Sequence, residues 1–236
     1  MSNEIRLLLI AAASIGFFHT ILGPDHYVPF IAMAKAKKWS YLKTVLITFL
    51  CGIGHVGSSI VIGLIGVWLG ITVGKLEMFE SIRGNWAAWA LIVFGFVYFI
   101  YGLKQAIKNK PHTHPHIHSD GEIHIHKHAH KLEHSHVHQS NGASYVPWAL
   151  FVVFVLGPCE PLIPILMYPA AKQSMVGMVL VASVFSAVTI ITMIASVLIT
   201  TFGMNLLPLK NFERYVHAIS GFAILLCGCA IQFLGL

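Results

Sequence analysis

The stretch His19-Thr-Ile-Leu-Gly-Pro-Asp25-His26 decides how this chain is interpreted, because it places two imidazoles and a carboxylate inside apolar sequence. Mostly apolar residues precede it over 6–18 and follow it over 27–34. An Asp at the centre of a membrane helix costs about 2.5–3.5 kcal/mol on insertion scales, so such residues usually mark an ion or substrate path. Proline removes a backbone donor and clashes with the preceding turn, so we expect the helix to break at Gly23-Pro24. The stretch therefore predicts half of a divalent-metal site.

The composition is that of an integral membrane protein. The chain has 236 residues, 56% of them hydrophobic and only 10% charged, with a mean hydropathy of +0.76. A soluble domain carries about 25% charged residues. Long apolar runs without alternation indicate membrane helices rather than a barrel, with the lipid bilayer as partner. The excess of 15 Lys and Arg over 9 Asp and Glu is explained by loop charges that orient such helices, so no nucleic-acid partner is predicted.

Six membrane spans are predicted, with a polar loop between the third and the fourth. They cover about 6–34, 41–73, 86–107, 145–171, 175–206 and 215–236, and residues 75–83 are expected at the membrane interface. Four cysteines lie within apolar segments and form no CxxC pair, so no disulfide framework is expected.

An internal repeat relates the two halves. Leu22-Gly23-Pro24 recurs as Leu156-Gly157-Pro158 at an offset of 134, and Phe79-Glu80 recurs as Phe212-Glu213 at an offset of 133. The glycine pair at 95 and 102 also recurs at 228 and 235. Three spans per half force the halves into opposite orientations, which is the inverted-repeat plan of many secondary transporters.

The predicted fold is therefore an all-α polytopic membrane protein, with six transmembrane helices in two inverted three-helix repeats. The first helix of each repeat is broken at Gly-Pro. The predicted units are a first repeat over 1–107, a His-rich loop over 108–143 and a second repeat over 144–236.

Basic residues predict the orientation in the cell membrane. If the lysines at 35–43 face the cytoplasm, 11 of the 15 basic residues do so, and four lie outside: Arg6, Lys75, Arg83 and Lys172. The positive-inside rule then places both termini outside and the His-rich loop in the cytoplasm.

That loop contains 11 of the 15 histidines, between His112 and His138. A His-rich tract is a metal-binding composition, because imidazole suits Zn, Cu, Ni and Co ions. The tract offers no apolar content on which to fold, so we expect it to lack a fold without metal.

Further candidate ligands lie in the spans. His55 is placed among glycines and serines that permit close helix approach, although a lone His is often a core residue. Cys159-Glu160 stands at the position that corresponds to Asp25-His26. Glu160, the only other acid in a predicted span, is a ligand or proton carrier, or alternatively a buried neutral acid. Cys159 is a soft ligand or a packing residue. The predicted metal ligands are His19, Asp25, His26, His55, Glu160 and Cys159.

These motifs resemble those of the nickel/cobalt transporter superfamily, in which a His, a short spacer and an Asp-His pair precede a Gly-His-Ser-Thr-like motif in the next helix. The spacer here has five residues rather than the usual four, and Val56 separates His55 from the serines. The His-rich loop resembles that of the family's efflux members. The stretch Gly157-Pro-Cys-Glu-Pro161 is also similar to motifs of thiol-disulfide membrane transporters.

The function predicted from the sequence is secondary transport of divalent transition-metal ions, Ni²⁺ or Co²⁺ first and Zn²⁺ or Fe²⁺ next. Alternating access around a midplane His/Asp site would carry the ion, and the loop favours efflux, although it could equally buffer metal after uptake. No enzyme activity and no permanently bound cofactor are predicted, and homo-oligomerisation stays open.

Three other functions fit parts of the sequence. A thiol-disulfide carrier needs a reactive Cys in each repeat, and Asp25 stands where the first would be. A sulfite or anion exporter needs Arg or Lys inside the membrane, and none lies away from the ends of the predicted spans. A metal sensor would need only the loop, and intramembrane His and Asp argue against it.

Overall fold

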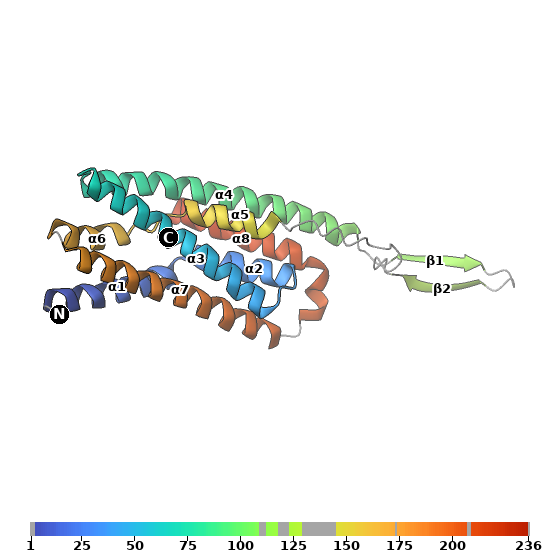
Figure 1. The fold of residues 1–236 in the computed structure, drawn as a ribbon. Helices are drawn as coiled ribbons and strands as arrows, with labels where there is room; N and C mark the ends of the chain where they lie inside the picture. Colours follow the sequence, from blue (N-terminus) through green and yellow to red (C-terminus); the bar gives the residue numbers. More distant parts are fainter. Residues whose placement is uncertain are drawn as a thin grey trace.

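The computed structural model describes residues 3–108, 112–117, 123–128, 145–172, 174–206 and 209–235. Within these ranges the chain is almost entirely helical (Figure 1). The α-helices are α1 (Asn3–Leu22), α2 (Val28–Ala36), α3 (Tyr41–Trp68), α4 (Val73–Lys108), α5 (Tyr145–Leu156), α6 (Leu162–Ala171), α7 (Met175–Leu206) and α8 (Val216–Leu234). The remaining elements are the 3-10 segments η1 (Pro24–His26) and η2 (Leu209–Tyr215) and the strands β1 (His112–Ile117) and β2 (Ile123–His128).

The protein is a multi-pass membrane protein. Five segments of the described chain are long and apolar enough to cross a bilayer: Asn3–Leu22, Tyr41–Trp68, Val73–Lys108, Met175–Leu206 and Phe212–Leu234. Large apolar side chains such as Leu7, Leu42 and Ile199 are exposed on these helices, as lipid-facing residues are.

The prediction of six transmembrane helices in two inverted repeats is not confirmed, because the broken segment 145–171 contains no helix long enough to span a membrane by itself. It is divided into α5, with 12 residues, and α6, with 10. A 12-residue helix is about 18 Å long, well short of a hydrocarbon core of about 30 Å. The two predicted Gly-Pro breaks are both present, since the segment 6–34 is likewise divided between α1 and α2.

The segment 75–83, which was predicted to lie at the membrane interface, is part of the long helix α4. α4 is continuous over 36 residues from Val73, and both Glu80 and Arg83 are buried on it. The two side chains are one helical turn apart and pair with each other, so the charges that suggested an interface are neutralised inside the protein.

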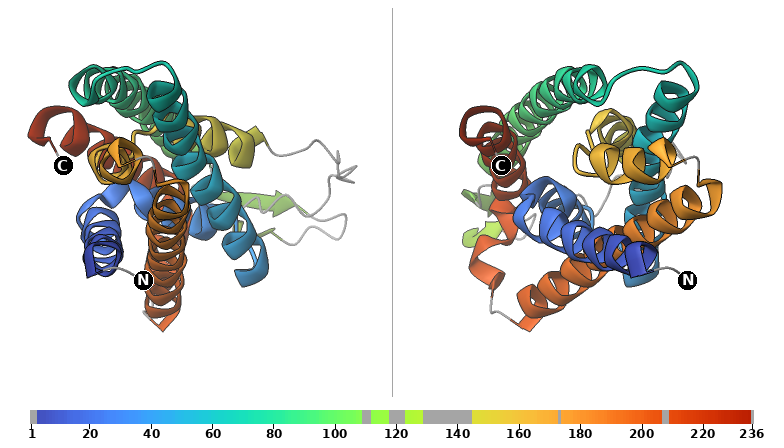
Figure 2. Two further views of the ribbon diagram at one scale, coloured as in Figure 1. Left: turned by 60° about the vertical axis from the view of Figure 1, so that its left-hand side comes forward. Right: turned by 90° about the vertical axis from the view of Figure 1, so that its left-hand side faces the viewer.

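The helices of the two halves interleave (Figures 1 and 2). α1 packs on α7, α3 packs on α5, and α4 lies along α8. The α4–α8 contact is made backbone to backbone: a Cβ added at Gly95 would collide with the backbone of Leu225, and one added at Gly221 with that of Phe99. Small residues allow this approach in membranes. The central core contains Phe30, Met33, Leu150, Met193 and Ile224.

The described part of the His-rich loop forms a hairpin that projects beyond the helices (Figure 1). β1 and β2 are antiparallel, with His112 opposite His128 and Ile117 opposite Ile123. The expectation that the tract lacks a fold was therefore wrong for 112–117 and 123–128, because alternating residues also suit a strand. The remainder of the predicted loop, 109–111, 118–122 and 129–143, lies outside the described residues.

Candidate functional site

At the first helix break, the polar groups of Gly23, Asp25 and His26 contact one another. α1 ends at Leu22, and η1 then carries Asp25 and His26 before α2 begins. Nδ1 of His26 lies 3.0 Å from the carbonyl oxygen of Gly23 and 3.1 Å from Oδ1 of Asp25. Both oxygens are acceptors, so Nδ1 carries the proton in the neutral ring and Nε2 presents its lone pair away from them. A carboxylate or carbonyl placed behind an imidazole in this way is the usual support of a metal-binding His.

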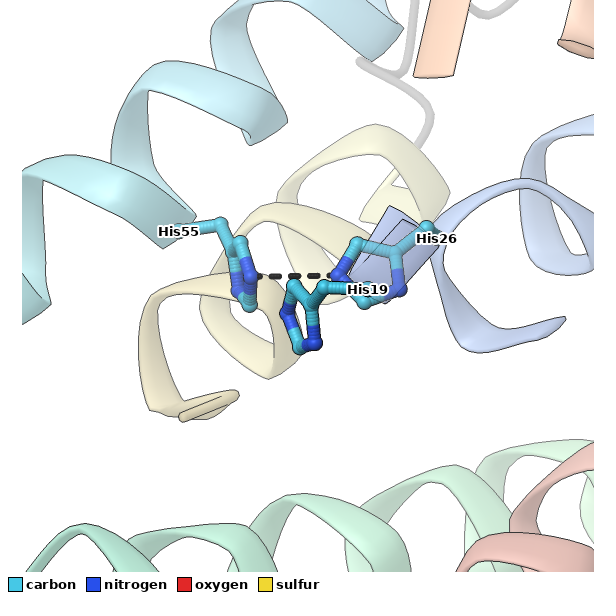
Figure 3. Close-up of side chains that lie close together, drawn as sticks. All are labelled: His19, His26 and His55. Atoms are coloured by element: carbon cyan, nitrogen blue, oxygen red, sulfur yellow. Dashed lines mark hydrogen bonds between the residues drawn. The ribbon is translucent and has the colours of Figure 1, made fainter. Parts of the chain in front are cut away.

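Three imidazoles from three segments converge beside this break (Figure 3). His19 comes from α1, His26 from η1 and His55 from α3, and one nitrogen of each lies within 4.8 Å of the others. We call these residues the histidine triad. His26 and His55 are buried, and His19 is half-buried.

The spacing in the histidine triad has a chemical meaning. Nε2 of His26 and Nε2 of His55 are 3.3 Å apart. Two imidazole nitrogens bound at about 2.0–2.1 Å to a tetrahedral ion are separated by about 3.3–3.4 Å. The pair is therefore spaced either to share a proton or to bind one metal ion.

The second helix break is held from outside by α4. α5 ends at Leu156, and Arg83 Nη2 donates to the carbonyl oxygens of Val155 and Gly157, both at 3.0 Å. A proline break frees carbonyls of this kind, which need a partner where no water is present. Gly84 brings α4 close to the break, because a Cβ there would lie 2.8 Å from Pro158 Cγ.

Glu80 completes this support. It pairs with Arg83, and its Oε2 accepts hydrogen bonds from Ser59 Oγ at 2.9 Å and from the backbone N–H of Cys159 at 3.2 Å. Ser59 Oγ is also 3.1 Å from the nitrogen of Cys159. Sequence reasoning missed Glu80 and Arg83; their i, i+3 spacing between two apolar runs was the available signal.

The predicted ligands from the second break do not join the histidine triad. Cys159 is fully buried, with its Sγ 3.9 Å from Nε2 of His19, and Glu160 is exposed. Neither belongs to the cluster whose ligand atoms lie within 4.8 Å of one another. Their participation in metal binding stays a prediction.

One cavity of about 1010 Å³ lies between the two breaks. Its polar lining includes His19, Asp25, His26, His55 and Glu160, and the backbone of Gly157 and Pro158 forms part of its wall. Asp25 and Glu160 thus border the same space. The cavity lining contains no Lys or Arg among the described residues, since Arg83 is engaged by Glu80 and the α5 carbonyls.

The sequence of this chain is similar to one known family. The model of a family described as the cytochrome c biogenesis protein transmembrane region matches residues 26–230. This match covers more than half of the chain, so the chain belongs to that family of thiol-disulfide membrane proteins. No curated protein and no solved structure is detectably similar.

The assignment to the nickel/cobalt transporter superfamily was therefore wrong, and with it the predicted nickel or cobalt transport. The resemblance depended on a few polar residues at 19–26 and 54–58, with a longer spacer and an inserted valine. The family match extends instead along nearly the whole chain and begins only at His26. It favours the thiol-disulfide alternative.

Proposed function

We propose that this member of the cytochrome c biogenesis transmembrane family is a membrane thiol-disulfide carrier, with Cys159 as the reacting thiol. The observation that carries the proposal is the contact between Sγ of Cys159 and Nε2 of His19, 3.9 Å apart where the broken helices meet. An adjacent imidazole is the usual base that converts a thiol into the nucleophilic thiolate. Broken helices at the centre of a carrier are also where substrates bind.

The exchange proceeds through mixed disulfides. His19 takes the thiol proton, and the Cys159 thiolate attacks one sulfur of a partner's disulfide. A bond forms between Cys159 and that sulfur, the partner's S–S bond breaks, and the leaving thiolate takes the proton from His19. One thiol of a donor dithiol gives its proton to His19 and attacks Sγ of Cys159, so that the partner's second sulfur leaves as a thiolate, takes this proton, and Cys159 is bonded to the donor. The donor's other thiol loses its proton in the same way and attacks the donor sulfur of this new disulfide, and Cys159 leaves as a thiolate that takes the proton back. The partner disulfide is reduced, and the donor dithiol is oxidised to a disulfide.

Only one cysteine, Cys159, lies at the two helix breaks, which distinguishes this chain from a carrier with an internal disulfide between them. Asp25 occupies the first break where a second thiol would be needed, and the other cysteines lie on α3 and α8. All four cysteines are free thiols: Cys51, Cys159, Cys227 and Cys229. Because Cys159 is fully buried, one of the two breaks must move for the thiol to meet a partner in the cavity.

Alternating access by two inverted repeats would supply this movement. The packing of α1 on α7 and of α5 on α3 supports the repeat, because exchanging the halves converts one contact into the other. With the positive-inside rule, both termini lie outside and the His-rich loop lies in the cytoplasm. Reporter fusions at residue 120 and at the C-terminus test this orientation.

The test of the function uses a chain in which Cys51, Cys227 and Cys229 are changed to Ser. In membrane vesicles this chain should form a mixed disulfide with an oxidised dithiol peptide, detected by a gel shift and released by dithiothreitol. Adding His19→Ala should slow the reaction about tenfold or more near neutral pH. A chain with Cys51 as its only cysteine is the matched control, and equal reaction of the two chains would contradict the proposal.

The histidine triad supports a second function, the binding of a transition-metal ion. We propose that His19, His26 and His55 bind the ion and that Asp25 orients His26. Three imidazoles suit Zn and Cu ions better than Mg²⁺ or Ca²⁺. The ion would lie next to Cys159 and would compete with the proton that His19 takes from the thiol.

Metal content separates the two functions. The purified protein, carrying no His-tag and lacking residues 112–138, should bind about one Zn²⁺ per chain. His26→Ala should remove this ion, whereas the control His217→Ala on α8 should retain it, because His217 bonds Tyr98 outside the cavity. Equal zinc content in both variants would contradict the metal site.

A further inference from the structure

We infer that Glu80 and Arg83 are positioning residues that aim the Cys159 thiol at His19. The inference rests on the proposed thiol function and adds to it the two side chains on which that function depends. Neither residue lines the cavity between the breaks, so neither is placed to touch a substrate there. Their contacts are all with the second break and with α3.

The first step is the orientation of Cys159. Its backbone N–H is shared between Ser59 Oγ at 3.1 Å and Glu80 Oε2 at 3.2 Å. Fixing the nitrogen of Cys159, which directly follows Pro158, restricts the direction of its Cβ. That direction places Sγ 3.9 Å from the ring of His19.

The second step is the role of Arg83. Its Nη2 reaches Ser58 Oγ at 2.8 Å and two carbonyl oxygens of the second break at 3.0 Å. A planar guanidinium with several fixed donors can hold these groups together, whereas a lysine ammonium cannot match that arrangement. Arg83 therefore ties the end of α5 to α3 and to Glu80 at the same time.

Stability alone does not explain why charges stand here. Glu80 is completely buried, and the desolvation of a buried ion pair commonly offsets its attraction. An apolar pair of similar volume is often equally stable or more stable. What an apolar pair lacks is the set of directed hydrogen bonds to the backbone of the break, and this set is the function that we assign to Glu80 and Arg83.

The test measures geometry separately from carrier activity. In the chain that keeps only Cys159, His19→Cys introduces a second thiol, and a one-carbon bis-methanethiosulfonate should link the two. The double variant Glu80→Gln with Arg83→Met removes both charges, so it should fold while cross-linking about tenfold more slowly or less. Arg83→Lys, which keeps the charge without the fork, should cross-link at an intermediate rate.

Two results separate this inference from the function on which it rests. An unchanged cross-linking rate in the double variant, with an unchanged melting temperature, would overturn the positioning role. Failure of Cys159 to react with partner disulfides would overturn the carrier function, while a cross-link that still depends on Glu80 and Arg83 would leave the positioning role standing. The Ser58→Ala variant, which removes a single contact of Arg83, should slow cross-linking only slightly.

Discussion

Both helix breaks lie at a Gly-Pro pair, but the polar groups that stabilise them come from different parts of the chain. At the first break, the polar groups come from the break itself, where Asp25 and the Gly23 carbonyl hold His26. At the second, they come from a distant helix, where Arg83 caps the freed carbonyls and Glu80 holds the backbone of Cys159. The first break uses its own polar groups and so presents imidazoles to the cavity. The second break is held by α4, and this support fixes the small side chain of Cys159.

The largest expected effect tests the dependence of the second break on α4. Arg83→Met alone leaves Glu80 buried and unpaired, which should lower the free energy of unfolding by about 3–5 kcal/mol. Thermal unfolding in detergent measures the change. The double variant Glu80→Gln with Arg83→Met is the control and should unfold near the wild-type temperature. If the single variant is as stable as the double, the pair is not the support of this break.

The second prediction compares the same substitution at the two breaks. A Cβ at Gly23 would lie 2.6 Å from Nδ1 of His26, whereas one at Gly157 would lie 3.2 Å from Nδ1 of His55. Gly23→Ala should therefore displace His26 and reduce Zn²⁺ affinity about tenfold or more. Gly157→Ala should have a smaller effect, since its neighbour needs to move by only a few tenths of an ångström. A zinc titration against a competing chelator ranks the two variants, and the reverse order would contradict the difference between the breaks.

Sequence reasoning predicted the breaks and the convergence of His19, His26 and His55 beside one of them, because Gly-Pro and intramembrane imidazoles are local signals. It did not predict the start of α4. Taken alone, Glu80 and Arg83 each predict a position exposed to water. Only their pairing across one helical turn makes them compatible with the protein interior. The directions of Cys159 and Glu160 depend on the turn between α5 and α6, which no periodic pattern encodes. The family assignment was wrong because it depended on a few polar residues, whereas the family model matches residues 26–230.

The third prediction concerns the carboxylate behind His26. Asp25→Asn keeps the size of the side chain but removes the charge that orients the ring, so Zn²⁺ affinity should fall about 10–100-fold. The melting temperature should stay near that of the wild type, because Asp25 borders the cavity. The same chelator titration measures the affinity. Undiminished zinc binding would show that His26 does not need this partner.

The smallest effect is expected at the acid of the second break. Glu160 is exposed and stands outside the histidine triad, so Glu160→Gln should change the free energy of unfolding by no more than about 0.5 kcal/mol. Zinc affinity should also be unchanged. A loss comparable to that of Asp25→Asn would make Glu160 a ligand and the two breaks more alike than their contacts indicate.

The glycine contact between α4 and α8 limits how the molecule can change shape. Where two backbones touch, no layer of side chains lies between them to shear, so the two helices have to move as one rigid body. That body carries Glu80 and Arg83, and it therefore carries the second break with it. Among the described residues, Asp25 and His26 of the first break hydrogen-bond each other, Gly23 and His55 of α3, but neither α4 nor α8. Opening of the cavity is therefore expected as a hinge at Gly23, with α1 swinging against a frame that keeps the thiol still.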